Sequence, residues 1–145
     1  MESKIENVLL ILNNRLNPIA IKWMIAGSLG LALHGLNVNP RDVDLVFHQK
    51  DLSKVCGLFF DYNPSSPELG FNKEYEFSKL SIDNLGVELL GDFEHGSYGI
   101  ELSKGYDLIP FHGFNIPVMT LEGQKRCYES ERKIGKIKLI EDFIG

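Results

Sequence analysis

The chain has 145 residues, enough for one domain (residues 1–145) that buries about two-thirds of the surface its unfolded form exposes. Hydrophobic residues make up 43% and charged residues 24%, which are ordinary values for a globular protein. The net charge of −5 argues against a large nucleic-acid footprint, which usually needs a basic face, but it does not exclude nucleic acid as a partner.

The sequence also indicates a cellular location. Residues 1–4 lack the apolar stretch of a signal peptide, and no apolar run approaches the roughly 20 residues that span a bilayer. Cys56 and Cys127 lie far apart and show no metal-binding spacing, so we expect two reduced thiols. We therefore expect a cytoplasmic protein with no membrane partner.

The first half of the chain alternates between helical and extended patterns. Apolar residues recur at helical spacing after Ser3, a plausible N-cap, until Asn17-Pro18 ends the helix. Gly35 and the turn residues at 37–40 separate a second helical segment from the next extended one. After the first helix, the expected elements are a buried strand over 21–26, a short helix over 29–34, a strand over 44–47 and a helix over 51–60.

The second half begins with a loop over 61–70 and then turns largely extended. Pro117 removes a ladder donor, which favours an edge position for the last strand. Thr120 is expected to cap a final helix that runs to Phe143, with a break near Gly135. The expected strands are 74–82, 87–90, 98–100 and 114–118. The fold class predicted is α+β, a small mixed β-sheet flanked by helices.

Gly27-Ser28 stands where the first strand ends and a helix begins. Backbone N–H groups at a helix start attract anions, Gly27 would let a ligand approach the backbone, and the Ser28 hydroxyl can donate to a phosphate oxygen. The alternative is that Ser28 merely caps its helix. On its own the pair favours the cap; together with the acids at 42 and 44, it favours phosphate binding.

Those acids are Asp42 and Asp44, which flank Val43 at the start of the second strand. Residues two apart on a strand point to the same side, so Val43 should face the core and the two carboxylates should lie together. Two like charges side by side need compensation, and Mg²⁺ takes carboxylate and phosphate oxygens. The alternative places Asp42 in the preceding turn and Asp44 in water.

A third carboxylate would complete a two-metal arrangement, in which one ion activates the attacking oxygen and the other stabilises the leaving pyrophosphate. Glu88 is the first candidate because it interrupts an apolar strand, and a strand beside Asp44 would bring it within reach. Asp92, in the turn after that strand, is the second candidate. A solvent-facing strand position is the alternative for Glu88.

These motifs resemble those of the polymerase-beta-type nucleotidyltransferase superfamily. Ala26-Gly27-Ser28-Leu29-Gly30-Leu31-Ala32-Leu33-His34-Gly35, followed by Arg41-Asp42-Val43-Asp44-Leu45-Val46, is similar to the signature of its small stand-alone members. These are the minimal, lincosamide and abortive-infection-type nucleotidyltransferases. The resemblance implies the nucleotidyltransferase fold and a Mg²⁺-dependent transfer of a nucleoside monophosphate from an NTP, most simply ATP, to an acceptor hydroxyl with release of pyrophosphate.

The same resemblance implies further site residues. Lys136-Ile137-Lys138-Leu139-Ile140-Glu141-Asp142 is similar to a basic segment of these families, which would bring Lys138 to the triphosphate, although Leu139 replaces the expected acid. Arg41 could neutralise the acids or contact a phosphate; a surface arginine in a turn is the alternative. A solvated basic face is the alternative for Lys133 and Lys136.

The sequence leaves the acceptor and the partners open. The acceptor could be an antibiotic, a tRNA end, a protein hydroxyl or a metabolite. Because 145 residues leave little chain for an acceptor pocket, a homodimer or a small helical partner protein could complete it. The alternative function is a non-catalytic, antitoxin-like module of the same fold that binds a nucleotide or a partner.

Overall fold

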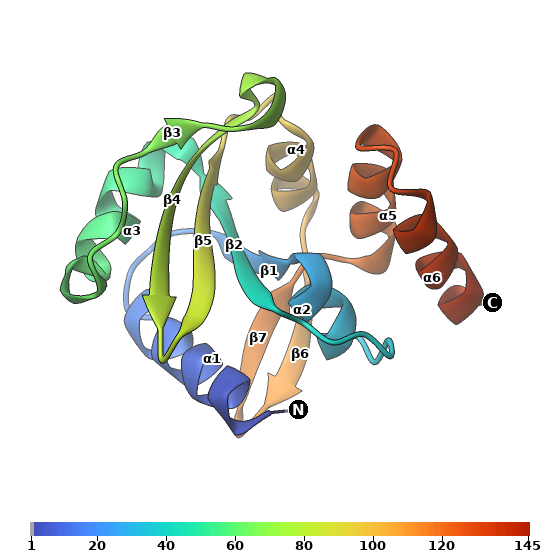
Figure 1. The fold of residues 1–145 in the computed structure, drawn as a ribbon, viewed down its shortest axis with the longest axis horizontal. Coiled ribbons are helices and arrows are strands. Elements are labelled where there is room, and N and C mark those ends of the chain that lie inside the picture. Colours follow the sequence, from blue (N-terminus) through green and yellow to red (C-terminus); the bar gives the residue numbers. More distant parts are fainter. Residues whose placement is uncertain (1) are drawn as a thin grey trace.

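The computed structural model describes residues 2–145, which form a seven-stranded mixed sheet with helices on both faces (Figure 1). The strand order is β3-β4-β5-β2-β1-β7-β6. Strand β2 pairs antiparallel with β1 and parallel with β5, and β1 pairs parallel with β7. The strands are β1 (Trp23–Ala26), β2 (Asp42–His48), β3 (Glu68–Leu69), β4 (Tyr75–Ile82), β5 (Leu85–Asp92), β6 (Asp107–Phe111) and β7 (Phe114–Val118). The predicted α+β class is confirmed.

Within residues 2–145, six α-helices and three short 3-10 turns surround the sheet. None of the described helices combines the length and apolar character that crossing a bilayer requires. The helices are α1 (Ser3–Leu16), α2 (Gly27–Leu33), α3 (Leu52–Leu58), α4 (Ser97–Lys104), α5 (Leu121–Ser130) and α6 (Ile134–Ile144). The 3-10 turns are η1 (Gln49–Asp51), η2 (Phe60–Tyr62) and η3 (Phe71–Lys73).

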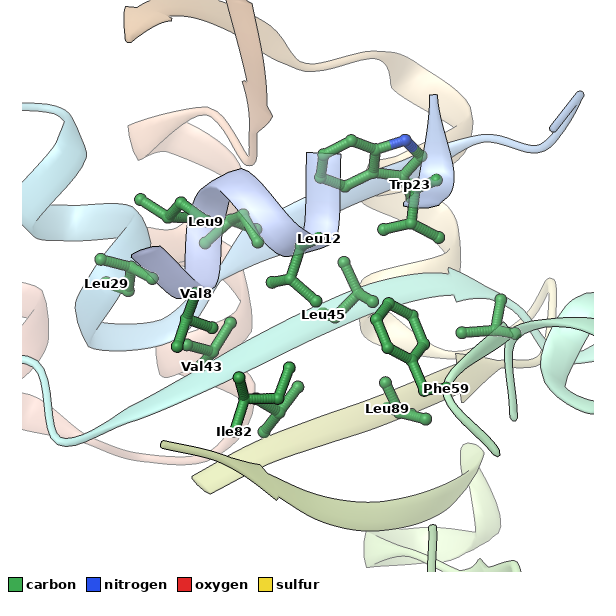
Figure 2. Close-up of a cluster of buried hydrophobic side chains, with 14 of the residues drawn as sticks. Val8, Leu9, Leu12, Trp23, Leu29, Val43, Leu45, Phe59, Ile82 and Leu89 are labelled. Carbon is green, nitrogen blue, oxygen red and sulfur yellow. The ribbon is translucent and has the colours of Figure 1, made fainter. Parts of the chain in front are cut away.

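The larger core lies between the sheet and helices α1 and α3 (Figure 2). Alternate residues of β2 point into it, because successive strand side chains face opposite sides. Helix α1 contributes one apolar stripe at helical spacing, as its sequence predicts. The labelled members of this cluster are Val8, Leu9, Leu12, Trp23, Leu29, Val43, Leu45, Phe59, Ile82 and Leu89.

A second core covers the opposite face of the sheet, beneath α4 and α5. Met24 of β1, Val46 of β2 and Leu90 of β5 pack there against Leu102 of α4 and Cys127 of α5. A third, smaller cluster joins α2 to the C-terminal helices through Leu31, Leu36, Tyr128 and Ile140. The candidate site lies on this second face, so its geometry depends on how α5 and α6 are held.

The segment over 98–100, expected to be a strand, is part of helix α4. The expectation was wrong because three residues of alternating character cannot distinguish a short strand from a helix. In the folded chain Asp92 accepts a hydrogen bond from the amide of Gly99 at 2.6 Å, which satisfies a backbone donor in the first turn of α4. The tertiary contact decides the conformation.

The strand over 114–118, expected at an edge, lies between β1 and β6. The edge on this side of the sheet is β6, a strand that the sequence analysis did not predict. Proline in both strands, Pro110 and Pro117, weakens the strand pattern. The strands are nevertheless joined by a tight hairpin turn whose residues His112 and Gly113 both have positive φ, 46° and 85°, the geometry of a type I′ turn.

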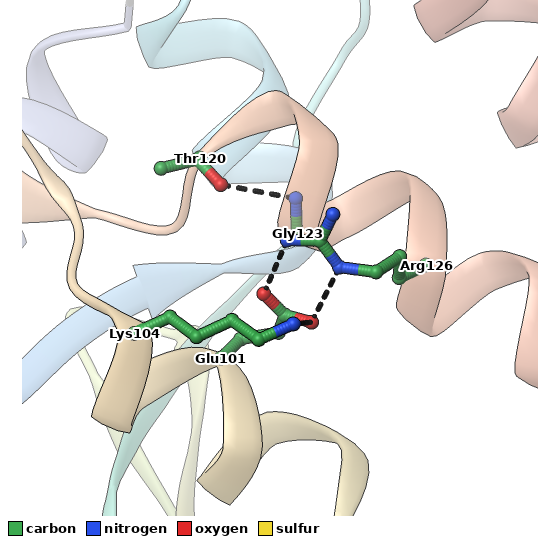
Figure 3. Close-up of polar contacts among 5 residues, drawn as sticks. All are labelled: Glu101, Lys104, Thr120, Gly123 and Arg126. Carbon is green, nitrogen blue, oxygen red and sulfur yellow. Dashed lines mark hydrogen bonds and ion pairs between the residues drawn. The ribbon is translucent and has the colours of Figure 1, made fainter.

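The C-terminal helical segment is divided into α5 and α6, and the break that the sequence predicted near Gly135 falls at 131–133. Arg132 has a positive φ of 58°, which breaks the helix. Thr120 caps α5 as predicted, with its hydroxyl accepting from the Gly123 amide at 3.0 Å (Figure 3). Ser3 is the first residue of α1 instead of its cap; Glu2 occupies the cap position without a side-chain bond.

Candidate active site

Strand pairing brings three carboxylates to one edge of the second face. Val43 is buried in the larger core, so Asp42 and Asp44 lie on the other side of β2. In the parallel β2–β5 ladder, Asp44 is the register partner of Glu88. Residues in register share a face, so the acidic side chains predicted from two separate parts of the sequence are neighbours.

Two glycines make room for two of these carboxylates. A Cβ atom at Gly27 would overlap the carboxylate of Asp44, and one at Gly86 would lie 2.7 Å from Oδ1 of Asp42. Gly27 also has a φ of +67°, in the left-handed region that side chains disfavour. The absent side chain of Gly27 thus accommodates Asp44, where the sequence analysis expected it to accommodate a ligand.

Asp44 occupies an unfavourable position for a charge. Burial raises its pKa to about 7, and the carboxylates of Glu88 and Asp42 act in the same direction, with Lys133 opposing them. Three neighbouring acids, with Asp44 the most enclosed of them, are stable together in their ionised form only when cations compensate their charge. The arrangement therefore favours binding of a cation.

A cavity of about 410 Å³ opens beside the acids. Its lining includes Asp42, Asp44, Ser28, Arg41 and Asn39. It also includes Lys136 of α6, whose Nζ donates to the Ser28 hydroxyl at 3.4 Å. The lining thus combines two carboxylates with a hydroxyl and two cationic side chains.

Lys138 is not brought to this cavity. Its ammonium pairs with Asp142 at 3.6 Å, and its side chain is 75% exposed. Lys136 occupies the position that the sequence analysis assigned to Lys138. The two residues are only two positions apart, but side chains two positions apart on a helix are rotated by about 200° around its axis relative to each other. One can therefore face the cleft while the other faces solvent.

Asp92, the second candidate for the third acid, lies away from the other carboxylates. Its register partner on β2 is His48, four residues beyond Asp44 and therefore ~13 Å along the strand. Burial raises the pKa of Asp92 to about 7, opposed by its hydrogen bonds from the α4 backbone. Its contacts mark it as a residue that orders the start of α4.

The three carboxylates suit a hard cation by their chemistry, but they do not form a ready-made cage. Within residues 2–145, no group of three or more His, Cys, Asp or Glu side chains is already gathered as a metal site. Mg²⁺ rarely uses such a cage: it commonly takes one or two carboxylates and completes its shell with water and substrate phosphate. Asp42 and Asp44, bordering a cavity that also presents a hydroxyl and two cationic side chains, fit that pattern.

One residue of the site, Gln124 of α5, escaped the sequence analysis. Its side-chain amide binds both backbone groups of Gly27, accepting from the N–H at 3.2 Å and donating to the carbonyl at 3.0 Å. The available signal was a polar residue on the buried face of a helix that otherwise packs apolar side chains. Without the fold, nothing indicates that its partner lies 97 residues earlier.

Other cavities of the described chain lie outside this cluster or at its border. One of about 190 Å³ shares Asp42 and Glu88 with it and is bounded by Lys79, whose ammonium is 3.5 Å from Glu88. A larger one of about 700 Å³ lies between α3 and the loop over 63–67 and contains none of the carboxylates.

Three solved structures share this fold. A candidate nucleotidyltransferase from Thermotoga maritima has a TM-score of 0.79 at 22% identity, with 99% of this chain and 94% of that chain covered. The antibiotic-resistance factor ANT(2'')-Ia has a TM-score of 0.69 at 10% identity, with coverage of 100% and 86%. The lincosamide antibiotic adenylyltransferase LnuA has a TM-score of 0.62 at 15% identity, with 97% of each chain covered. The fold is that of the nucleotidyltransferases.

The sequence comparison narrows this class. The family model for aminoglycoside-2''-adenylyltransferase matches residues 8–140, which is most of the chain. No curated protein sequence matches. The chain belongs to the aminoglycoside-2''-adenylyltransferase family and is a nucleotidyltransferase, which confirms the resemblance found in its motifs.

Proposed function

We propose that the protein transfers AMP from ATP to an acceptor hydroxyl, with Mg²⁺ as the metal ion and pyrophosphate as the second product. The observation that carries this proposal is the alignment of Asp42, Asp44 and Glu88 beside a cavity lined by Ser28 and Lys136. The proposed location is the cytoplasm, where ATP is abundant and where two unpaired thiols are stable.

The reaction joins the acceptor oxygen to the α-phosphorus of ATP and breaks the bond between that phosphorus and the pyrophosphate oxygen. Asp42 and Asp44 would hold the metal, which supplies positive charge against the phosphate oxygens. Ser28, Lys136 and Arg41 would bind the polyphosphate by hydrogen bonds and charge. Most of the rate enhancement in such transfers comes from positioning and charge neutralisation.

Glu88 is proposed to accept the proton of the acceptor hydroxyl. Its side chain is 38% exposed and lines the smaller cavity of about 190 Å³, which shares Asp42 with the main cavity. Lys79 of the neighbouring strand β4 is the register partner of Glu88, and its ammonium forms an ion pair with the Glu88 carboxylate. An acceptor entering through the smaller cavity would therefore meet Glu88 before the phosphate-binding groups.

The proposed acceptor class is an aminoglycoside, because the matching family is defined by adenylylation of one. The net charge of −5 favours a polycationic acceptor by electrostatic attraction. Lincomycin is the second acceptor to assay, since it is bound in a structure of the same fold.

The test measures transfer of the α-phosphate label of ATP, together with pyrophosphate release. The wild type is incubated with Mg²⁺ and an aminoglycoside that has a free 2''-hydroxyl, and in parallel with lincomycin. We expect labelled product from the wild type and at least about a hundredfold less from Asp42→Asn and Asp44→Asn. Asp142→Asn, a 66% exposed carboxylate, serves as the matched control.

Two results would count against the proposal. Full activity in either aspartate variant would refute the metal assignment. Calorimetric binding of Mg·ATP without turnover for every acceptor would favour the non-catalytic module instead.

The partner is also part of the proposal: a second copy of the chain, or a small helical protein, completes the acceptor pocket. Light scattering of the active sample tests the homodimer. A species that is active and strictly monomeric would contradict both forms of this assembly.

A further inference from the structure

Gln124 makes a paired contact with the backbone of a residue far away in the sequence. It is 1% exposed, and its amide group both accepts from the Gly27 N–H and donates to the Gly27 carbonyl. A side-chain amide that uses both ends on one residue restrains that residue in position and orientation. The backbone of Gly27 is therefore fixed from α5 as well as by its neighbours in the chain.

Gly30 is the residue that lets Gln124 come so close. A Cβ atom at Gly30 would lie 2.6 Å from Nε2 of Gln124 and 3.3 Å from the carbonyl oxygen of Ile25. Gly30 is also an internal residue of helix α2, where glycine is unfavourable by roughly 1 kcal/mol relative to alanine. Gly30 thus lowers the stability of helix α2, but it makes room for the contact between Gln124 and Gly27.

The restrained residue supports a proposed catalytic side chain. The carboxylate of Asp44 lies directly against the α-carbon of Gly27, where no side chain larger than hydrogen fits. Ser28, the next residue, carries the hydroxyl that Lys136 contacts. A shift of Gly27 would therefore move the surface beneath Asp44 and the position of the Ser28 hydroxyl together.

Helix α5 is well placed to act as an anchor, because two further contacts fix it. Thr120 caps its first turn, and Arg126 forms a two-point ion pair with Glu101 of α4, with both N–O distances 2.8 Å (Figure 3). Glu101 is buried, so this pair is less exposed to water than a typical surface pair. Gln124 projects from the segment between these two contacts.

We propose that Gln124 is a positioning residue of the active site, which acts through the Gly27 backbone to hold Asp44 and Ser28 in the arrangement that binds Mg·ATP. This inference rests on the proposed function for its ligand. The contact itself, and the rigidity it confers on Gly27, can be tested without that ligand.

The experiment uses Gln124→Met, which keeps the length of the side chain and removes both hydrogen bonds. Gly30→Ala leaves Gln124 in the chain and displaces its amide. The matched control is Thr120→Ala, which weakens the same helix at its cap without a contact to Gly27. We expect Gln124→Met and Gly30→Ala each to raise the KM for Mg·ATP about tenfold, from two lost hydrogen bonds.

The KM for the acceptor is expected to change by less than about twofold in the same variants. The double variant should be little worse than the more impaired single variant, since both changes remove one contact. Thr120→Ala should leave both KM values near those of the wild type. Equal KM values for Mg·ATP in Gln124→Met and Thr120→Ala would overturn the proposal.

Amide hydrogen exchange without nucleotide supplies the second measurement. In Gln124→Met, exchange at Gly27 should accelerate about tenfold more than in Thr120→Ala, because only the first variant removes its acceptor. Unchanged protection at Gly27 would overturn the inference even if the enzyme is active. Accelerated exchange, with a wild type that does not bind Mg·ATP, would refute the proposed function and leave the anchoring role standing.

Discussion

Asp44 combines a buried setting with two acidic neighbours. Burial raises its pKa to about 7, and Glu88 and Asp42 add to the effect. A group in this state reduces the stability of the folded chain whenever it is ionised and uncompensated. The residue is therefore maintained at a cost to folding, as expected for a side chain that serves a site.

Replacement of Asp44 by asparagine should raise the thermal stability of the protein in metal-free buffer at pH 8. The neutral amide of nearly the same shape removes the buried charge and its repulsion. Mg²⁺ with ATP should raise the melting temperature of the wild type and leave that of Asp44→Asn unchanged. Differential scanning fluorimetry measures both effects, and a lower melting temperature for the metal-free variant would contradict the first.

Lys136 and Lys138 offer a matched pair on one helix. Lys136 reaches Ser28 in the cleft, whereas Lys138 faces solvent beside Asp142. We expect Lys136→Ala to weaken binding of Mg·ATP about tenfold or more, because a charge-assisted phosphate contact is lost. Lys138→Ala should bind as the wild type does. Calorimetric titration of each variant with Mg·ATP measures the two affinities. A larger loss in Lys138→Ala than in Lys136→Ala would support the assignment of Lys138 made from the sequence.

At the scale of elements, α4 depends on a carboxyl group of the neighbouring strand. Asp92 is 1% exposed, and its carboxylate accepts the Gly99 amide in the first turn of the helix. Its pKa is raised by burial to about 7, above the usual value of about 4 for an unfolded chain. The folded state therefore binds this proton more tightly than the unfolded state does.

This difference in proton affinity fixes the sign of a pH dependence. The stability that Asp92 contributes as a neutral acid is fully present below about pH 4 and is lost as the pH rises through about 7. Asp92→Asn should remove this part of the dependence, so its stability should fall less than that of the wild type between pH 4.5 and 8. Urea unfolding at several pH values measures the difference; parallel curves for the two proteins would refute it.

Elements with strong local signals were predictable from the sequence, and those that depend on distant contacts were not. The apolar stripe of α1 is periodic over many residues, β2 and β5 each contain a short apolar run, and the Thr120 cap is a local hydrogen bond. Helix α4 and strand β6 carry weak local patterns, and their conformations depend on pairing and capping by other segments.

The candidate site divides in the same way. The relation between Asp42 and Asp44 is local, since strand geometry alone puts two such residues on one side. The prediction that Glu88 lies beside Asp44 needed one further assumption, that their two strands are adjacent in the sheet. Gln124 and Lys136 depend on how the α5–α6 pair is oriented over the sheet, which no local pattern encodes.

At the scale of the whole molecule, the chain closes around its sheet through segments from both ends. Helix α1 covers one face, β7 pairs with β1 inside the sheet, and α5 lies on the opposite face with α6 packed beside it (Figure 1). We propose that residues 1–145 form one cooperative unit, because the larger core takes side chains from α1 through β7. A single unfolding transition seen by both fluorescence and circular dichroism is the expected result.

A buried leucine tests that cooperativity. Leu12 of α1 is fully buried in the larger core, whereas Leu108 of β6 is 59% exposed. Leu12→Ala should lower the free energy of unfolding by about 2–5 kcal/mol through lost burial and a residual cavity. Leu108→Ala should change it by less than about 1 kcal/mol. Urea titration provides both values, and similar losses would show that α1 contributes little to the common core.

The long reach of Gln124 and Lys136 back to residues 27 and 28 has a consequence for synthesis of the chain. The ribosome releases the glycine–serine turn and all three carboxylates well before it releases either contact. A nascent chain that stops before residue 120 already contains all three acids. It lacks the contacts from Gln124 and Lys136 that hold residues 27 and 28 in place. Nucleotide binding should therefore begin only after α5 and α6 have emerged and packed against the rest of the fold.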